Sequence, residues 1–532
     1  MESMTPHPTP SHTDGRIRGS RSALNWLVPF ALIAAFSVLW ALASPVFSVP
    51  DENAHAVKAV AQLRGEVIGR TEPGRMHIIV DLPEGFDYNH SMMCYLFAAE
   101  EPAACNAEFG DGSGEDDFAT WVGAYNPIYY YLVGWPSLVF DDGATAVYAM
   151  RVASALLSAL LLAWAFQAGL AMRDTRWMPF GLSFLAMPMV VYLAGSVNPN
   201  GVEIAAGAAL WIGSFRLLQS YGPTRLSIDP PTLPRWYLWL IVTVAAIMLV
   251  NARAIGPLWV VVIVGACLVI AGWTTTKRLF TDPRAYPWLG GIAAGSLFAI
   301  VWTLATGGTA GQAGAGDAPL VGASALTGVV AMLRRTGDWV QQALGYFGWL
   351  DTPLPADLYA LIYVALGFLV LLAFLGTNRR GVWITGAVIA GTILVPAIVQ
   401  GVQVGRTGLI WQGRYGIVLM VAIPIIAALV LAAPSSERLA FLARRTSWVG
   451  VTAVSVFGFG AFLVVLRRYV TGVDVPWSAM ITAPSWQPPI GWIPLVAAYG
   501  VVSVLFAIWL VWESRISPRQ VEDLRAERPA HD

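Results

Sequence analysis

The sequence predicts an all-α polytopic membrane protein with about twelve transmembrane helices. Of its 532 residues, 56% are hydrophobic and 12% are charged, whereas a soluble domain usually carries about 25% charged residues. About 20 apolar residues span the hydrocarbon core as a helix, and many stretches of the chain meet that length. The net charge of −1 gives no bulk basicity for nucleic acid. We therefore expect the lipid bilayer, and no nucleic acid, among the partners.

The expected spans follow the hydrophobic runs of the chain. The first run, from Ala23 to Ser44, is too long for the core of a signal peptide and has no clear small-residue cleavage site, so we expect it as a retained first span. We place the spans at residues 23–45, 146–171, 177–196, 200–218, 236–251, 255–274, 286–305, 356–376, 382–401, 412–432, 447–466 and 489–512.

Arginine and lysine gather at one end of these spans, which fixes the expected orientation. They occur in both terminal tails and in the turns around Arg173, Lys277, Arg379 and Arg438. Because basic residues mark the cytoplasmic side, we expect a multi-pass protein of the bacterial plasma membrane with both termini in the cytoplasm. The expected parts are a cytoplasmic N-terminal tail (1–22), a transmembrane domain (23–512) and a cytoplasmic C-terminal tail (513–532).

Two long connections are then expected on the extracytoplasmic side, at 46–145 and 306–355. Within the first, residues 125–140 read YNPIYYYLVGWPSLVF and are apolar enough for a further span. Counting them as a crossing would invert everything after them and place the basic turn 173–176 outside. We therefore expect a juxtamembrane helix at the outer face, where tyrosine and tryptophan are common.

Polar residues follow the first span at once, in SVPDENAHAVKAV (48–60). Asp51, His55, Lys58 and Gln62 are spaced by four, three and four, so they share one face of a helix, and we expect an amphipathic helix at the interface. Ser48 and Asp51 also resemble a capping box. Asp51 is therefore either a helix cap or a catalytic carboxylate at the membrane surface.

Further polar residues lie at the same end of the predicted spans. Charged groups within a membrane are costly and often functional, although each one alone can be an interfacial anchor. Arginine forks match phosphate oxygens, and a nearby carboxylate can act as general base. The candidates for substrate binding are His55, Asn126, Arg151, Asn200, Glu203, Arg253 and Arg414. The chain shows no P-loop, dinucleotide motif, HExxH or CxxC in a supporting context, and we assign no metal ligands.

The first long connection also holds two of the three cysteines. Cys94 and Cys105 can pair if this loop faces an oxidising compartment, or they can remain free thiols. The third cysteine, Cys267, lies in an apolar run.

Four motifs resemble the family of membrane proteins known as domain of unknown function 2142. PVFSVPDENAH resembles its P-x-D-E-x-x-H signature, and SVNPNGVEIAAGAALW resembles its N-P-(D/N)-x-x-E segment. GWLDTPLP and WQGRY resemble later motifs of the family. The resemblance covers roughly residues 24–510.

More distantly, the layout resembles the GT-C class of membrane glycosyltransferases. NPIYYYLV and YAMRVASALL are similar to that class's PPLYYLL segment and the span that follows it, with Asn126 in place of the first proline. This resemblance implies a GT-C-like fold, a polyprenyl-phosphate sugar donor and usually an inverting reaction, with Asp51 as base and Glu52 as the alternative. Some members use a divalent metal ion and others do not, so a metal cofactor stays open.

The expected function is thus transfer of a sugar from a polyprenyl-phosphate donor to an extracytoplasmic envelope acceptor, which is a saccharide, a lipid or a protein. One alternative is a transporter or flippase of lipid-linked saccharide precursors, although transporters often have repeated halves and polar helices near the midplane, whereas here the ionisable residues favour the outer ends and no repeat is evident. A second alternative is a structural membrane subunit without chemistry of its own.

Overall fold

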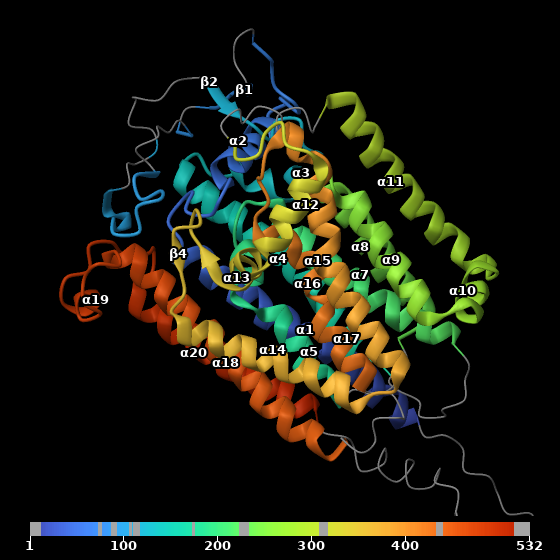
Figure 1. Ribbon diagram of the computed structural model, residues 1–532. Helices are drawn as coiled ribbons and strands as arrows, with labels where there is room; N and C mark the ends of the chain where they lie inside the picture. Colours follow the sequence, from blue (N-terminus) through green and yellow to red (C-terminus); the bar gives the residue numbers. More distant parts are fainter. Residues whose placement is uncertain are drawn as a thin grey trace, which may run out of the picture.

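The computed structural model describes residues 12–72, 77–83, 85–86, 93–105, 109, 117–172, 176–222, 233–307, 318–431 and 440–514. Most of the two predicted tails, 1–22 and 513–532, and the turn residues 173–175 lie outside this set. The described chain forms a bundle of long helices, with short helices and two small two-stranded antiparallel sheets packed beside them (Figure 1).

Ten described helical segments are long and apolar enough to cross a membrane, or eleven if one bent pair counts as a single span. This confirms the multi-pass helical class. The unbroken helices are α1 (His12–Ala43), α4 (Gly143–Leu170), α7 (Pro199–Tyr221), α8 (Arg235–Ala252), α11 (Tyr286–Thr306), α14 (Ala356–Gly376), α15 (Arg379–Thr407), α18 (Ala440–Thr471) and α20 (Trp492–Glu513). A further crossing is made by η7 (Gly413–Gly416), α16 (Ile417–Met420) and α17 (Ala422–Leu431).

The bent pair corrects the predicted span 255–274. Helix α9 (Gly256–Ala271) ends at Gly272, which has a φ of 84°, a conformation that glycine adopts without steric cost. Helix α10 (Trp273–Phe280) then leaves at 117° to α9. The short turn η5 (Pro283–Ala285) leads from α10 into α11.

The prediction of one continuous helix at 177–196 is wrong. This segment consists of α5 (Met178–Ser183), η4 (Phe184–Ala186) and α6 (Pro188–Ala194). Proline has no N–H and disfavours a helical backbone at the residue before it. Met187 is accordingly extended, with φ −58° and ψ 145°, and the helix breaks there.

The broken segment nonetheless carries the chain across the bundle. Arg151, early in α4, donates hydrogen bonds to backbone carbonyls at the end of α1. Asn198, just before α7, donates to the carbonyl of Pro50 near the same place. From Arg151, α4 runs for 19 further residues away from this place, a length of about 28 Å. The segment that follows must therefore return over a similar distance to the end of the bundle where α1 finishes, which we call the α2 end.

The small elements of the first connection pack at the α2 end. They are α2 (Glu52–Leu63), β1 (Ile78–Asp81), η2 (Ala103–Cys105), β2 (Asp117–Thr120), α3 (Ile128–Gly134) and η3 (Trp135–Leu138). β1 and β2 pair antiparallel, with Ile78 opposite Thr120. The short α3 and η3 confirm that residues 125–140 are not a full span, and they expose Tyr131, Leu132 and Trp135.

Helix α2 is not the interfacial helix that the sequence predicts. Every residue from Glu52 to Gln62 is buried. The polar face is used internally: Lys58 Nζ donates to the carbonyls of Val67 and Gly123, each at 2.7 Å. Gln62 likewise donates to the carbonyl of Pro127. Lys58 and Gln62 therefore bind backbone carbonyls of the loop that covers them.

The elements of the second connection complete the α2 end. They are α12 (Ala325–Arg334), α13 (Thr336–Gly345), and the strands β3 (Tyr346–Phe347) and β4 (Thr352–Pro353), followed in the last connection by α19 (Ala479–Thr482). Trp349, in the turn between β3 and β4, donates its indole N–H to the carbonyl of Phe47. This hairpin therefore packs on the segment that joins α1 to α2.

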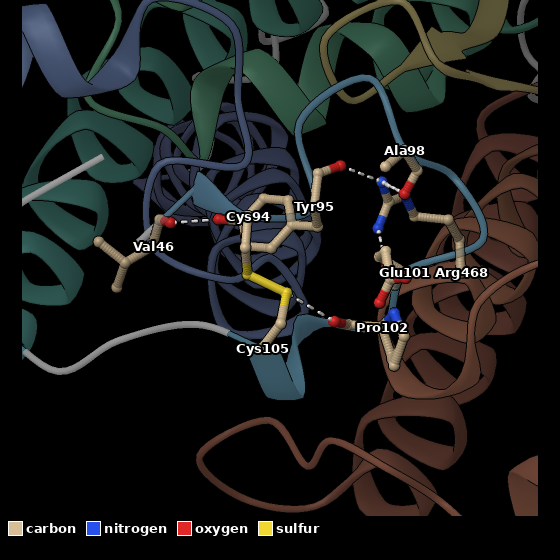
Figure 2. Close-up of a disulfide and its surroundings, with 8 residues drawn as sticks. All are labelled: Val46, Cys94, Tyr95, Ala98, Glu101, Pro102, Cys105 and Arg468. Carbon is tan, nitrogen blue, oxygen red and sulfur yellow. Dashed lines mark hydrogen bonds between the residues drawn. A yellow bond between two sulfur atoms is a disulfide. The ribbon is translucent and has the colours of Figure 1, made fainter. Parts of the chain in front are cut away.

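Cys94 and Cys105 form a disulfide, which resolves the two alternatives left by the sequence (Figure 2). Within the closed loop, the hydroxyl of Tyr95 donates to the carbonyl of Val46 at 2.5 Å. Cys267 is free and buried. The disulfide loop is therefore attached to the chain just beyond α1.

Arg468 of α18 holds the same loop from the other side (Figure 2). Its side chain is completely buried and donates to the carbonyls of Tyr95, Ala98 and Glu101. It also lies 3.3 Å from the carboxylate of Asp351. One arginine thus joins α18, the disulfide loop and the β3–β4 turn.

Candidate active site

Asp51 has an unusual backbone at the start of α2. Its φ of 67° and ψ of 0° lie in the left-handed region, which is uncommon for residues other than glycine. It occupies the position before the first helical residue, yet its side chain makes no capping hydrogen bond. The capping interpretation is therefore wrong. Such strained conformations are costly and occur often at functional sites.

The carboxylate of Asp51 instead forms an ion pair with Arg414, which lies in η7 more than 360 residues later in the chain. Arg414 also donates to the carbonyl of Pro50 at 3.1 Å. The side chain of Arg414 is 6% exposed and that of Asp51 is 27% exposed. The pair is thus held from within the protein while the carboxylate keeps access to the outside.

Tyr415 places a second arginine beside this pair. The guanidinium carbon of Arg253 lies 4.3 Å from the centre of the Tyr415 ring, and that of Arg414 lies 5.2 Å from it. Such contacts between a cation and an aromatic ring are favourable. Tyr415 is not among the predicted site residues, although it ends the WQGRY motif that signals Arg414.

The N-terminus of α7 fixes Arg253. Nη1 of Arg253 lies 3.4 Å from Oδ1 of Asn200 and 3.8 Å from Oε2 of Glu203. Glu203 is itself held by the indole N–H of Trp259 at 2.9 Å. Arg253, which lies against Tyr415, therefore meets two predicted residues of α7, Asn200 and Glu203.

Two buried donors in this cluster have no hydrogen-bond partner within the described part of the chain. They are Nε of Arg414 and Nδ2 of Asn200. A buried donor left without a partner costs about 1–3 kcal/mol. The cluster thus combines two guanidiniums with two unpartnered N–H groups, which is a donor set suited to phosphate oxygens.

Small cavities flank the cluster on two sides, each of about 10 Å³, roughly the space of one water molecule. One is lined by Arg253 and Asn126, and the other by Arg414 and Gln342. Asn126 donates to Oδ1 of Asn251 at 2.7 Å. Asn126 therefore borders the cluster without binding its arginines.

Burial and charge both act on the ionisable groups of α2. Burial tends to raise the pKa of Asp51, but the positive charge of Arg414 and its other neighbours outweighs burial and holds the pKa below its ordinary value. Burial lowers the pKa of His55 to about 3. Its Nδ1 lies 2.8 Å from the hydroxyl of Tyr130. At neutral pH, Asp51 is therefore ionised and His55 is uncharged.

Glu52 and Arg151 lie together but apart from the exposed edge. Both side chains are 0% exposed, and the guanidinium donates to both carboxylate oxygens, at 2.8 and 2.5 Å. The backbone N–H groups of Phe47 and Val197 donate to the same carboxylate. These contacts leave the Glu52 carboxylate enclosed, with no surface for a substrate.

The described residues around Asp51 do not offer the ligand set of a divalent cation. Among the described residues, no group of three histidine, cysteine, aspartate or glutamate side chains is arranged to hold a metal ion. The immediate neighbours of the Asp51 carboxylate are cationic, whereas a hard cation needs several oxygen ligands.

Comparisons with known proteins give one family and two solved structures. The family model described as "Predicted membrane protein (DUF2142)" matches residues 35–423. The crystal structure of ArnT from Cupriavidus metallidurans bound to undecaprenyl phosphate superposes with a TM-score of 0.42 at 14% identity, covering 92% of this chain and 78% of that chain. The apo structure of the same protein gives 0.40 at the same identity and coverage. No curated protein matches the chain.

Proposed function

The chain belongs to the DUF2142 family of predicted membrane proteins, and we propose that it is a membrane glycosyltransferase that uses a polyprenyl-phosphate-linked sugar. The observation that carries the proposal is the ion pair of Asp51 with Arg414, to which Arg253 is joined through Tyr415. A partly exposed carboxylate beside two guanidiniums is the set of groups that such a transfer requires. The GT-C-like motifs of the sequence support the same class.

In the proposed reaction, the hydroxyl oxygen of the acceptor attacks the anomeric carbon of the donor. The bond from that carbon to the phosphate oxygen breaks, and the polyprenyl phosphate leaves with the electron pair. Asp51 accepts the hydroxyl proton as general base. Arg253 and Arg414 stabilise the negative charge that develops on the phosphate. Attack from the face opposite the leaving group inverts the anomeric centre.

Arg414 has a second part in this scheme. In the free protein it pairs with Asp51 and holds the pKa of that carboxyl low, which makes Asp51 a weak base. A bound phosphate would compete for the same guanidinium, because phosphate and carboxylate accept the same N–H fork. Loss of that pairing raises the pKa of Asp51. Donor binding would thus strengthen the base at the moment it is needed.

The other predicted residues take supporting roles in the proposal. Asn200 offers its unpartnered Nδ2 to the donor, and Glu203 positions Arg253. His55 stays uncharged and packs against the aromatic rings of the first connection. Asn126 borders the cavity beside Arg253 and can contact the donor or the acceptor. Glu52 and Arg151 hold the end of α1 against α4 and α7, so we assign the base to Asp51 alone.

We place the α2 end on the extracytoplasmic side of a bacterial plasma membrane, with both termini in the cytoplasm. The disulfide loop lies at this end, and disulfides persist in oxidising compartments. The basic turns at Lys277 and Arg380 lie at the opposite end, in agreement with the positive-inside rule. The acceptor is then an envelope saccharide, lipid or protein, reached by the extracytoplasmic connections 46–145 and 306–355.

The test is turnover by the purified protein in liposomes. The probes are polyprenyl-phosphate monosaccharides of differing sugar, supplied with envelope extract as acceptor, and the readout is release of polyprenyl phosphate by mass spectrometry. We expect release by the wild type and by Asp338→Asn, a control in an exposed carboxylate of α13, and release reduced by about 10²–10⁴-fold in Asp51→Asn. Movement of unchanged donor between leaflets without release would favour the flippase alternative and overturn the proposal.

A further inference from the structure

A long apolar groove lies between α9 and α15, away from the Asp51 cluster. Its volume is about 500 Å³, within the range of small-molecule and lipid sites. Trp383, Ala387 and Gly391 line it from α15, and Val262 and Ile270 line it from α9. These positions recur at helical spacing, so each helix gives one continuous face. Small residues at 387 and 391 leave the space open.

The groove belongs to the end of the bundle opposite the α2 end. Helix α15 runs 27 residues from Arg380 to its last residue, about 40 Å, and the chain then reaches Arg414 beside Asp51. Arg380 lines the far end of the groove. It donates to the carbonyl of Ile270 at 2.6 Å, close to where α9 bends into α10.

The length of the groove matches one leaflet. Its lining on α15 runs from Arg380 to Thr392, which is about 18 Å along the helix. One leaflet is about half of the ~30 Å hydrocarbon core. A glycerophospholipid acyl chain fits this length, whereas a polyprenyl chain is longer than one leaflet.

Basic side chains at the Arg380 end of the groove complete the site. Arg380 is exposed beside the groove, and its hydrogen bond to the carbonyl of Ile270 is donated by Nη2. Arg379, Lys277 and Arg278 are exposed at the same end, and no described acidic side chain forms an ion pair with any of the four. Basic pockets between transmembrane helices on the cytoplasmic side bind anionic lipid headgroups.

We propose that this groove binds an anionic glycerophospholipid of the leaflet opposite the Asp51 site, with its acyl chain between α9 and α15 and its phosphate on Arg380. The bound lipid fills the space between two helices of the bundle and so fixes α15, which leads into the Arg414 turn. The proposal is independent of the glycosyltransferase proposal, because it uses none of the Asp51 cluster.

The test measures lipids retained by the full-length protein. The protein is equilibrated with vesicles of equal parts phosphatidylglycerol and phosphatidylcholine, and retained lipids are counted by native mass spectrometry. We expect a preference for phosphatidylglycerol that falls about fivefold in Arg380→Gln, the effect of one basic residue at a lipid surface. Arg379→Gln, whose side chain does not line the groove, should keep most of the preference.

A matched pair of glycine variants tests the acyl chain. A Cβ added at Gly391 or at Gly386 has no neighbouring atom within 4 Å outside its own helix turn, so both positions have open space for a side chain, but only Gly391 lines the groove. We expect Gly391→Trp to lose the retained lipid and Gly386→Trp to keep it. Equal retention by the two variants, or no preference for the anionic lipid, would overturn the proposal.

Discussion

Glu52 and Arg151 form a doubly hydrogen-bonded ion pair in which both side chains are completely buried. The preceding residue, Asp51, is 27% exposed and pairs with Arg414. Two adjacent carboxylates thus have different environments. Because environment can separate the roles of two carboxylates, the enclosed Glu52 fits a structural role and Asp51 is the candidate for the proposed chemistry.

The buried pair predicts a large loss of stability in Glu52→Gln. The amide keeps the shape of the side chain but leaves the Arg151 charge buried without its counterion, which costs about 3–5 kcal/mol. Thermal unfolding of the detergent-solubilised protein measures the loss. Replacing both partners, by Glu52→Gln with Arg151→Met, should recover part of it. A Glu52→Gln protein with wild-type stability but no activity would instead assign Glu52 to catalysis.

The partly exposed carboxylate of Asp51 predicts that Asp51→Asn loses activity and keeps most of its stability. Asparagine tolerates the left-handed backbone that Asp51 adopts, so the variant should unfold at nearly the wild-type temperature. Without a general base, turnover should fall by about 10²–10⁴-fold. Release of polyprenyl phosphate in liposomes checks the activity, with Asp338→Asn as control. Turnover within a few-fold of wild type would remove Asp51 from the proposed role.

The disulfide predicts a redox-dependent stability. Cys94 and Cys105 close a loop whose carbonyls bind Arg468, and a disulfide over a loop of this size contributes about 2–4 kcal/mol. A reductant should therefore lower the unfolding temperature of the wild type and leave the Cys94→Ser, Cys105→Ser double variant unchanged. The remaining cysteine, Cys267, is buried and free, so a Cys267→Ala control should respond as the wild type does.

Hydrophobicity was enough to predict the long helices, because an apolar segment that crosses the membrane must form all its backbone hydrogen bonds internally, as a helix does. The break at Met187 follows from Pro188, whose local effect does not show in an average over the run. The bend after α9 needs Gly272, which can also occur within a straight helix. Composition therefore located the apolar runs and missed the points where backbone geometry interrupts them.

The candidate site was predictable as a set of residue types and not as a set of contacts. The spacing of His55 and Lys58 correctly placed them on one face, but the partners of Lys58 are backbone carbonyls such as that of Gly123, which carry no sequence signal. Arg151 and Arg414 look alike in sequence. Only their tertiary contacts show that one is enclosed with Glu52 and the other meets Asp51.

The lowered pKa of Lys58 predicts that the free energy of unfolding rises with pH. Burial lowers its pKa from 10.5 to about 7, so between about pH 7 and 10.5 the unfolded chain holds a proton that the folded chain has released. The free energy of unfolding therefore increases with pH in that window, by up to about 1.4 kcal/mol per pKa unit. Unfolding temperatures at pH 7 and pH 10 measure it.

Lys58→Met should remove this rise, because it removes the titrating group. The chain has one other lysine, the exposed Lys277, and Lys277→Met should retain the rise. An equal pH dependence in the wild type and in Lys58→Met would show that other groups cause it.

The contacts of Tyr415 predict that activity depends on its ring and not on its hydroxyl. The ring lies against the guanidiniums of both Arg253 and Arg414, while the hydroxyl accepts one long hydrogen bond from Arg414, at 3.3 Å. Tyr415→Phe keeps the ring and should retain most activity. Tyr415→Leu removes the surface that sets the spacing of the arginines. Since a small misplacement of catalytic groups can cost about 10²-fold, we expect a fall in kcat of about 10- to 100-fold with little change in unfolding temperature.

If Tyr415 only packs, Tyr415→Leu should lower stability and leave the kcat of the folded fraction unchanged. If its hydroxyl is the essential group, Tyr415→Phe should be as impaired as Tyr415→Leu. Either result would contradict a positioning role for the ring.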